Sequence, residues 1–167
     1  MDHDLPNFQI PHAEKIDWMI ETAGWAIESV DPGSFATSDG APFPVYSYSV
    51  NFDGFIDFPN VVVCGLTPVT CKGLFDLIIE VVPRARDSGS PIEINTDLLG
   101  LFDGEQRARF VSIDVQAWGE LFVSATSWYR GRSFEVVQLL WPDRNGFLPG
   151  EAGFDQKLRF AQPLLSL

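Results

Sequence analysis

Apolar residues recur with helical spacing in three stretches of this chain, residues 13–24, 68–86 and 114–131. Gly24 and Gly131 are placed to end the first and third helices, and Thr67-Pro68 supplies an N-cap and first residue for the second. The positions expected to face the core are Ile16, Met19, Ile20 and Ala23, then Val69, Leu74, Leu77, Ile78 and Val81, and finally Trp118, Leu121, Phe122, Ala125, Trp128 and Tyr129.

Other apolar runs are short and favour strands, at residues 25–30, 45–52, 60–64, 92–97, 106–113 and 134–141. In the second of these runs the apolar and polar residues alternate, so Tyr46, Tyr48, Val50 and Phe52 are expected to share one face of a sheet. Residues 60–64 are almost continuously apolar, which is typical of a strand that is buried on both faces.

The order of these elements predicts an α+β fold with a mainly antiparallel sheet of about six strands, backed by two main helices. Residues 1–11 contain two prolines and are expected to form an N-terminal arm. Residues 12–167 are expected to form a single domain, since a chain of 167 residues supplies one ordinary core.

Charge narrows the range of partners. The net charge is −12, and residues 1–60 hold ten Asp and Glu against Lys15 alone. Binding to nucleic acid needs a basic stripe that neutralises phosphates, so no nucleic acid partner is expected, and no anionic membrane. A basic partner surface stays open. No apolar run reaches the length of a membrane span, and the acidic start Met1-Asp2-His3-Asp4 is unlike a signal peptide, so we expect a cytoplasmic protein.

Cysteine and histidine limit the chemistry. Cys64 and Cys71 have no further cysteine or histidine at metal-ligand spacing, so we expect buried free thiols and no metal site. Both histidines, His3 and His12, precede residue 13, which weighs against His-dependent catalytic triads. No cofactor is assigned. The turn at Gly65 between strand and helix resembles a phosphate-binding turn, for a flavin as one example, but a single glycine favours ordinary packing.

Five segments of the chain stand in a recognisable order, namely residues 24–27, 46–50, 58–66, 138–146 and 162–164. Together they resemble the bacterial family named domain of unknown function 4262, over about residues 15–165. The most specific part is the Gln-Leu-Leu-Trp-Pro-Asp block at 138–143, followed by the Gln162-Pro163 tail. The chain departs from the family pattern at Asn51-Phe52, where the family has Gly-Leu, and at Gly150, where it has Trp. The resemblance implies domain boundaries and no activity.

Several polar or aromatic residues have no local structural explanation and are therefore candidate ligand-binding residues. They are Tyr46, Tyr48, Asn51, Gln138, Trp141, Asp143, Arg144 and Gln162. We expect the strand of Tyr46 and Tyr48 to meet Gln138, the turn at 141–146 and the tail. Two interpretations stay open for Gln138 and Gln162: they bind a ligand, or they only fasten the C-terminus to the sheet.

The leading functional hypothesis is a small cytoplasmic binding or interaction domain, without catalysis, for a small molecule or a protein partner. The alternative is a His-independent hydrolase or transferase that uses Asp143, Asp155 or Tyr48 with a metal or a bound cofactor. Titratable groups that converge in a pocket would favour the enzyme, and an apolar patch without them would favour the binding domain.

Overall fold

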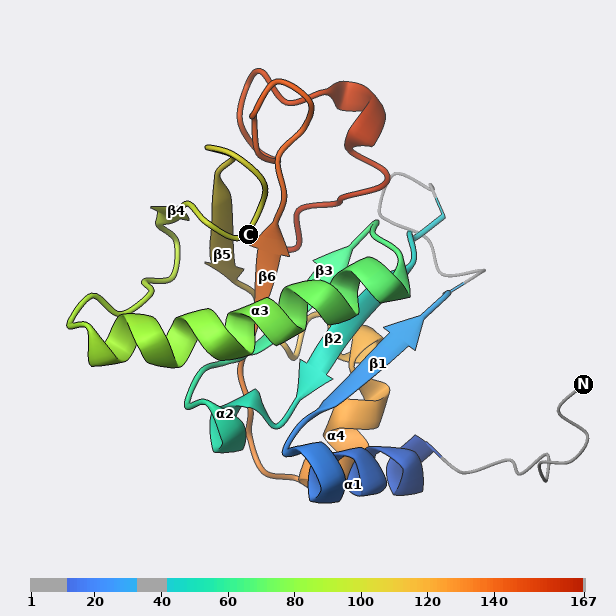
Figure 1. Ribbon diagram of the computed structural model, residues 1–167. Coiled ribbons are helices and arrows are strands. Elements are labelled where there is room, and N and C mark those ends of the chain that lie inside the picture. The colour runs from blue at the N-terminus through green and yellow to red at the C-terminus, as the bar shows by residue number, and fades with distance from the viewer. Residues whose placement is uncertain (1–11, 33–41, 167) are drawn as a thin grey trace, which may run out of the picture.

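A computed structural model describes residues 12–32 and 42–166 (Figure 1). The helices are α1 (His12–Ala23), α2 (Phe52–Phe55), α3 (Pro68–Asp87) and α4 (Val123–Tyr129), with short 3-10 turns η2 (Gly119–Leu121) and η3 (Gln156–Leu158). The strands are β1 (Ala26–Val30), β2 (Tyr46–Val50), β3 (Asn60–Cys64), β4 (Asp97–Leu98), β5 (Ala108–Ser112) and β6 (Val136–Leu140). The expected arm of residues 1–11 lies outside the described residues.

The six strands form one sheet in the order β1-β2-β3-β6-β5-β4. The α+β class and the number of strands are confirmed, but the sheet is mixed because β3 and β6 pair in parallel while the other neighbours are antiparallel. These two strands are buried at every position, so they occupy the centre of the sheet, and the intervening chain crosses over to bring them together.

Helices cover both faces of the sheet, which differs from the expected sheet backed by two helices (Figure 1). On one face α3 packs its buried residues Phe75 and Ile78 against Val61 and Val63 of β3. On the other face α1 packs against β1 and α4, and both helices share a core cluster with Tyr46 and Tyr48 of β2. Because the central strands are apolar on both faces, each face needs its own cover. None of the described helices has the length and apolar character needed to cross a bilayer.

The helix predictions hold at most positions. Gly24 ends α1 with φ +92°, and its amide donates to the Ile20 carbonyl. Thr67 caps α3, where its hydroxyl accepts from the Thr70 amide at 3.2 Å. Val69 was expected in the buried stripe, which is wrong, because it lies in the first turn and is 84% exposed. The residues that the stripe missed on the buried side of α3 are Cys71, Phe75 and Val82.

Two strand predictions are wrong. Residues 92–97 do not form a strand, and only Asp97–Leu98 pairs with β5, because Asn95 turns the backbone with φ +65°. Phe52 does not share the face of Tyr46 and Tyr48, since β2 ends at Val50 and the next residue adopts φ +72°. Phe52 instead packs on the α3 side against the rings of Trp25 and Phe75.

The third predicted helix is divided. Asp114 caps only a local turn, where its carboxylate accepts from the amides of residues 116 and 117. The helical residues after it form η2 and then α4. The helix ends at Arg130, which takes the left-handed conformation with φ +52° one residue before the expected Gly131.

Candidate functional site

Two buried glutamines hold the C-terminal tail. The Gln138 amide donates to the Pro163 carbonyl at 2.7 Å, and its oxygen accepts from the Leu165 amide at 2.9 Å. The Gln162 side chain makes the same pair of bonds to the backbone N–H and C=O of Trp141, both at 2.8 Å. Each side chain satisfies two backbone groups as a neighbouring strand would. These contacts match the fastening interpretation of Gln138 and Gln162.

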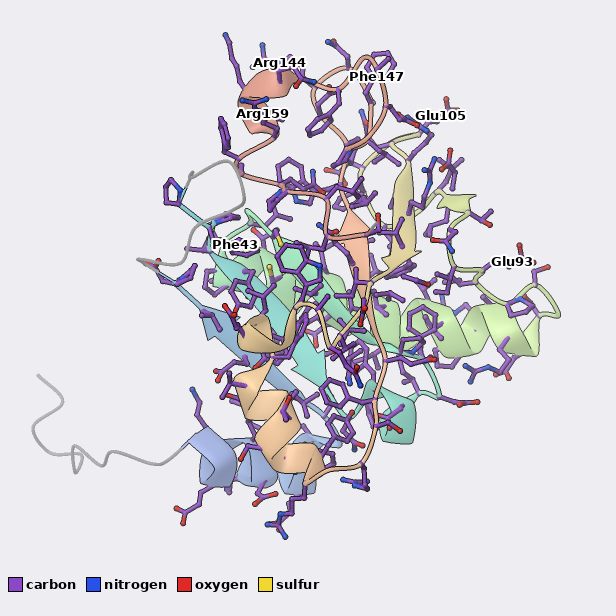
Figure 2. All side chains as sticks on the ribbon, turned by 180° about the vertical axis from the view of Figure 1, so that it is seen from behind. Phe43, Glu93, Glu105, Arg144, Phe147 and Arg159 are labelled. Carbon is purple, nitrogen blue, oxygen red and sulfur yellow. The ribbon has the colours of Figure 1, made fainter. Side chains whose placement is uncertain are left out.

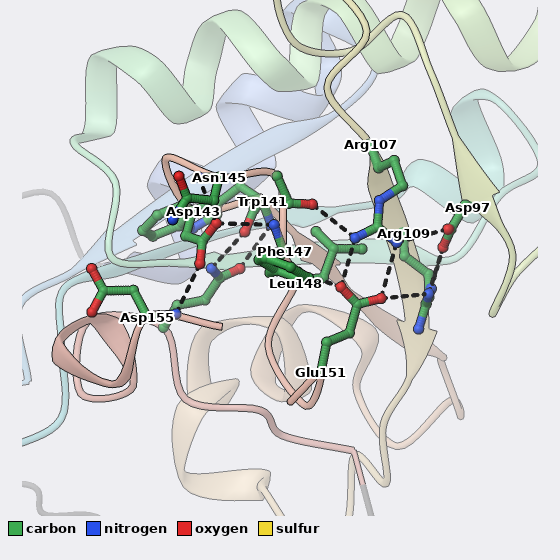
Figure 3. Close-up of polar contacts among 12 residues, drawn as sticks. Asp97, Arg107, Arg109, Trp141, Asp143, Asn145, Phe147, Leu148, Glu151 and Asp155 are labelled. Carbon is green, nitrogen blue, oxygen red and sulfur yellow. Dashed lines mark hydrogen bonds and ion pairs between the residues drawn. The ribbon is translucent and has the colours of Figure 1, made fainter. Parts of the chain in front are cut away.

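The turn that follows β6 is built around Asp143, which is 5% exposed (Figure 3). One carboxylate oxygen accepts from the amides of Asn145 and Phe147, and the other accepts from the amide of Asp155. Burial alone would raise the pKa of Asp143, but these amides outweigh it and hold the pKa below its ordinary value. Asp143 therefore acts as a structural anchor of this turn.

The other predicted residues of this region divide between the interior and the surface. The Trp141 indole donates to the Cys64 carbonyl at 2.8 Å, which ties the turn to the end of β3. Arg144 is exposed at the outer end of the molecule (Figure 2). Gln138, the 141–146 turn and the tail thus meet as predicted, and protein groups make all of these contacts. The strand of Tyr46 and Tyr48 was expected to meet Gln138 as well, which is wrong, because β3 lies between β2 and β6.

Tyr46 and Tyr48 lie in the core. The Tyr46 hydroxyl donates to the Leu121 carbonyl at 2.8 Å, and its ring stacks on Tyr48 with centroids 6.1 Å apart. Tyr48 is 1% exposed, and burial is the main cause that raises its pKa to about 12. Both residues line a hollow of about 360 Å³ with little of their own surface exposed, and the raised pKa keeps both phenols protonated, so neither acts as a base near neutral pH.

The remaining predicted residue, Asn51, leads to a polar network that the sequence did not reveal. At its centre the Tyr129 hydroxyl donates to Asp53 at 2.5 Å. The same oxygen accepts from the side-chain amide of Asn60 at 2.8 Å and from the backbone N–H of Asn51 at 3.1 Å. Asn60 also accepts from the Phe52 amide. The network joins α2 and β3, which are neighbours in the sequence, to α4, whose Tyr129 is 69 residues from Asn60.

Burial and geometry fix the orientation of Asp53. Tyr129 is 1% exposed, and its pKa is raised first by burial and then by the hydrogen bond to Asp53. The phenol therefore stays neutral and serves as a permanent donor to a carboxylate that is itself exposed. Asn51 and Asp57 flank α2 with φ +72° and +53°, and left-handed non-glycine residues of this kind concentrate at functional sites.

Asp53 lines a hollow of about 360 Å³. The other lining residues are Asp57, Phe58, Pro59, Ser133, Phe134 and Glu135. A second hollow of about 350 Å³ shares three of these residues and extends past Val136 to Asp114 and Gln116. We call the two hollows together the acidic groove. The Phe134 ring stacks on Tyr129 at 4.4 Å, so the network and the groove wall form one packed unit.

The groove is acidic in character. Of the described residues that line it, Asp53, Asp57, Asp114 and Glu135 are acids and none is a base. Within residues 12–32 and 42–166, no group of three or more His, Cys, Asp or Glu side chains is arranged to hold a metal ion. A single carboxylate can pair with an ammonium or guanidinium group.

The turn at Gly65 does not offer an open phosphate site. A Cβ atom at this glycine would lie 2.2 Å from the Ala161 carbonyl oxygen, so the C-terminal segment already covers the turn. The glycine, with φ +84°, is needed because of this close approach. Ordinary packing, the favoured alternative, accounts for it.

One sequence signal pointed toward the missed site. Asn60 begins an otherwise apolar strand and is 1% exposed, so its amide needs a partner, as the amide of Gln138 does. Its partner Tyr129 is 69 residues away in the sequence. No local pattern could indicate this contact.

The family model described as Domain of unknown function (DUF4262) matches residues 19–155. This span covers most of the chain, so the chain belongs to that family. No curated protein and no solved structure matches the chain. The matched span includes Asp53, Asn60 and Tyr129 as well as Gln138 and Asp143.

Proposed function

We propose that this member of the DUF4262 family is a small binding module, which holds a cationic group of a small molecule or of a protein partner in the acidic groove. The observation that carries the proposal is the Asp53 carboxylate, which buried Tyr129 orients at 2.5 Å on the wall of the groove. A carboxylate held in one geometry loses little entropy when it pairs with an ammonium or guanidinium group.

The distribution of charge supports a cationic ligand. Arg107 and Arg109 pair with Asp97 and Glu151, at the side of the sheet where β4 and β5 lie. Lys72 pairs with Asp76 on α3. These bases pair with acids away from the groove. Two further bases lie beside it, since Arg86 donates to the Asp57 carbonyl and Arg132 to the Tyr129 carbonyl. The four acids that line the groove outnumber these two bases, which leaves a negative excess that attracts cations.

The walls of the groove indicate the shape of the ligand. Phe58, Pro59 and Phe134 provide apolar surface beside the carboxylates. An amine or guanidinium on an aliphatic stem places its charge at Asp53 and its methylene groups on this surface. Arginine and lysine side chains and small polyamines have this form.

The positions of the alternative catalytic groups favour binding over hydrolysis or group transfer. Tyr48 is buried in the core. Both carboxylate oxygens of Asp143 accept hydrogen bonds from backbone amides. Asp155 accepts from the Lys157 amide in the first turn of η3. Each of these side chains has a structural role, whereas Asp53 is both oriented and exposed.

An NMR titration with agmatine, which carries a guanidinium and an amine on an aliphatic chain, tests the proposal. We expect amide shifts at Asp53 and at residues 133–135, with a Kd of about 1 mM, as is usual for a ligand of this size. Asp53→Asn should weaken binding about tenfold, because it removes one charge-assisted interaction and leaves an oxygen to accept from Tyr129.

Asp103→Asn is the matched control, since it removes the same charge from the exposed loop between β4 and β5. Agmatine should bind this variant as it binds the unmodified chain. Equal weakening in both variants would mean that agmatine responds only to net charge. The proposal would then be wrong.

A further inference from the structure

The C-terminal lobe, residues 141–166, keeps a defined shape with little regular structure. Its only helical element is η3, and it forms the end of the molecule opposite α2 (Figure 1). Long segments of this kind are uncommon in compact domains unless they have a function. The lobe is held by Asp143, by the two glutamines and by an ion pair to the sheet.

That ion pair compensates the charge of Glu151, one of the acids of the lobe. Glu151 accepts from the Arg107 guanidinium at 2.6 and 2.9 Å and from the Leu148 amide at 2.8 Å (Figure 3). Arg107 first, and then the Leu148 amide, lower the pKa of Glu151 to about 2. The carboxylate is thus permanently charged and fully compensated, so it repels an approaching anion only weakly.

The bases of the lobe, in contrast, lie outside these ion pairs. Arg144, Lys157 and Arg159 are exposed, and none of them takes part in an ion pair among the described residues. The Arg159 guanidinium lies 4.5 Å from the centre of the Phe160 ring. Stacking of this kind restrains a guanidinium while it leaves the N–H edge open to a planar oxyanion.

Arg159 also lines a pocket of about 280 Å³. Pro149, Phe154 and Leu164 give this pocket an apolar side. Its polar side chains are Arg159, Gln156, Gln162 and Glu151, and the Glu151 carboxylate is already paired with Arg107. Gly150 lines the same pocket with φ +89°, and a Cβ atom there would lie 3.2 Å from the Leu164 side chain. The glycine therefore leaves this wall open.

We propose that this pocket binds a small carboxylic acid with an apolar body. The Arg159 guanidinium pairs with the carboxylate through two parallel N–H···O bonds, and the body of the ligand lies on Phe154, Pro149 and Leu164. Inorganic phosphate offers the same oxyanion chemistry without the apolar body. The site is independent of the acidic groove, which lies at the other end of the molecule.

Phenylacetate is the probe, and its binding is followed by NMR on the unmodified full chain. We expect it to shift the side-chain N–H signal of Arg159 and the amides around Phe154, with a Kd of about 1 mM. Inorganic phosphate should bind at least about tenfold more weakly, because it gains nothing from the apolar side. Equal affinity for the two probes would overturn the assignment of the apolar side.

Three variants separate a defined pocket from general attraction to a basic surface. Arg159→Gln should weaken phenylacetate binding about tenfold, and Arg159→Lys should restore only part of it because it lacks the planar fork. Arg144→Gln removes the same charge from the same lobe outside the pocket lining, and it should leave the affinity unchanged. Equal losses in Arg144→Gln and Arg159→Gln, or no shift at Arg159, would overturn the proposal.

Discussion

The buried side-chain amide of Gln138 fixes the position of the C-terminal tail on the sheet. It stands in the apolar strand β6 at 0% exposure, and both ends of its amide pair with the backbone of the tail. Its sequence context raised a question that the sequence could not answer, because a ligand and a tail segment offer an amide the same donors and acceptors. The structure places the tail there.

Gln138→Leu is therefore expected to lower the free energy of unfolding by about 3 kcal/mol, because it leaves the Pro163 carbonyl and the Leu165 amide without their partner. Urea denaturation measures the effect. Gln116→Leu, at an exposed position, should change stability by less than about 0.5 kcal/mol. The agmatine affinity of the Gln138→Leu variant should be unchanged. If this variant is as stable as the unmodified chain, the fastening role is contradicted.

At the scale of elements, α4 joins two different neighbours. Phe122, at its start, is 0% exposed and meets the Tyr48 ring edge-on at 5.2 Å, so it packs on the sheet as expected. Trp128 was also expected on the sheet. Its indole instead donates to Asp17 at 2.8 Å and connects α4 to α1. Helix α4 thus packs on the sheet near its start and contacts α1 near its end.

This difference predicts unequal costs of truncation. Phe122→Ala should destabilise the fold by about 3–5 kcal/mol, because it opens a cavity between α4 and the sheet. Trp128→Ala should cost clearly less, since the indole is half-buried and its loss mainly loosens α1. Urea denaturation of both variants gives the comparison. A larger cost for Trp128→Ala would show that the contact between the helices, and not the contact with the sheet, dominates.

Elements with strong local signals were the ones that sequence could predict. Thr67-Pro68 marked the start of α3, and the apolar run 60–64 matches β3 residue for residue. The strand prediction for residues 92–97 was wrong because Ile92 and Ile94 pack on the core from a loop. This loop has the same alternation of apolar and polar residues as a strand. The sequence did not predict the acidic groove, for a different reason. Tyr129 and Asp53 are 76 residues apart, so only the folded chain brings them together.

At the scale of the whole molecule, the tyrosines, the two cysteines and the carboxylates set the pH range of stability. Burial raises the pKa of the Cys64 and Cys71 thiols. All three tyrosines, Tyr46, Tyr48 and Tyr129, have a raised pKa, in each case chiefly because of burial. Asp97 and Glu151 have a lowered pKa, mainly because of Arg107. The folded chain therefore binds protons more tightly than the unfolded chain at high pH and less tightly at low pH. Stability should be greatest between these two ranges.

The alkaline side gives the clearest test. Above the ordinary tyrosine pKa of 10, the unfolded chain loses phenol protons that the folded chain keeps, so each phenol lowers stability by about 1.4 kcal/mol per pH unit until its folded pKa is reached. For Tyr48 that range ends at about pH 12. Tyrosinate absorbance should therefore appear together with the loss of far-ultraviolet circular dichroism as pH rises. Tyr48→Phe, which removes one titrating phenol, should make the fall in stability with pH less steep. Tyrosinate absorbance that develops in the folded protein, near pH 10 and before circular dichroism changes, would contradict the burial of the three phenols.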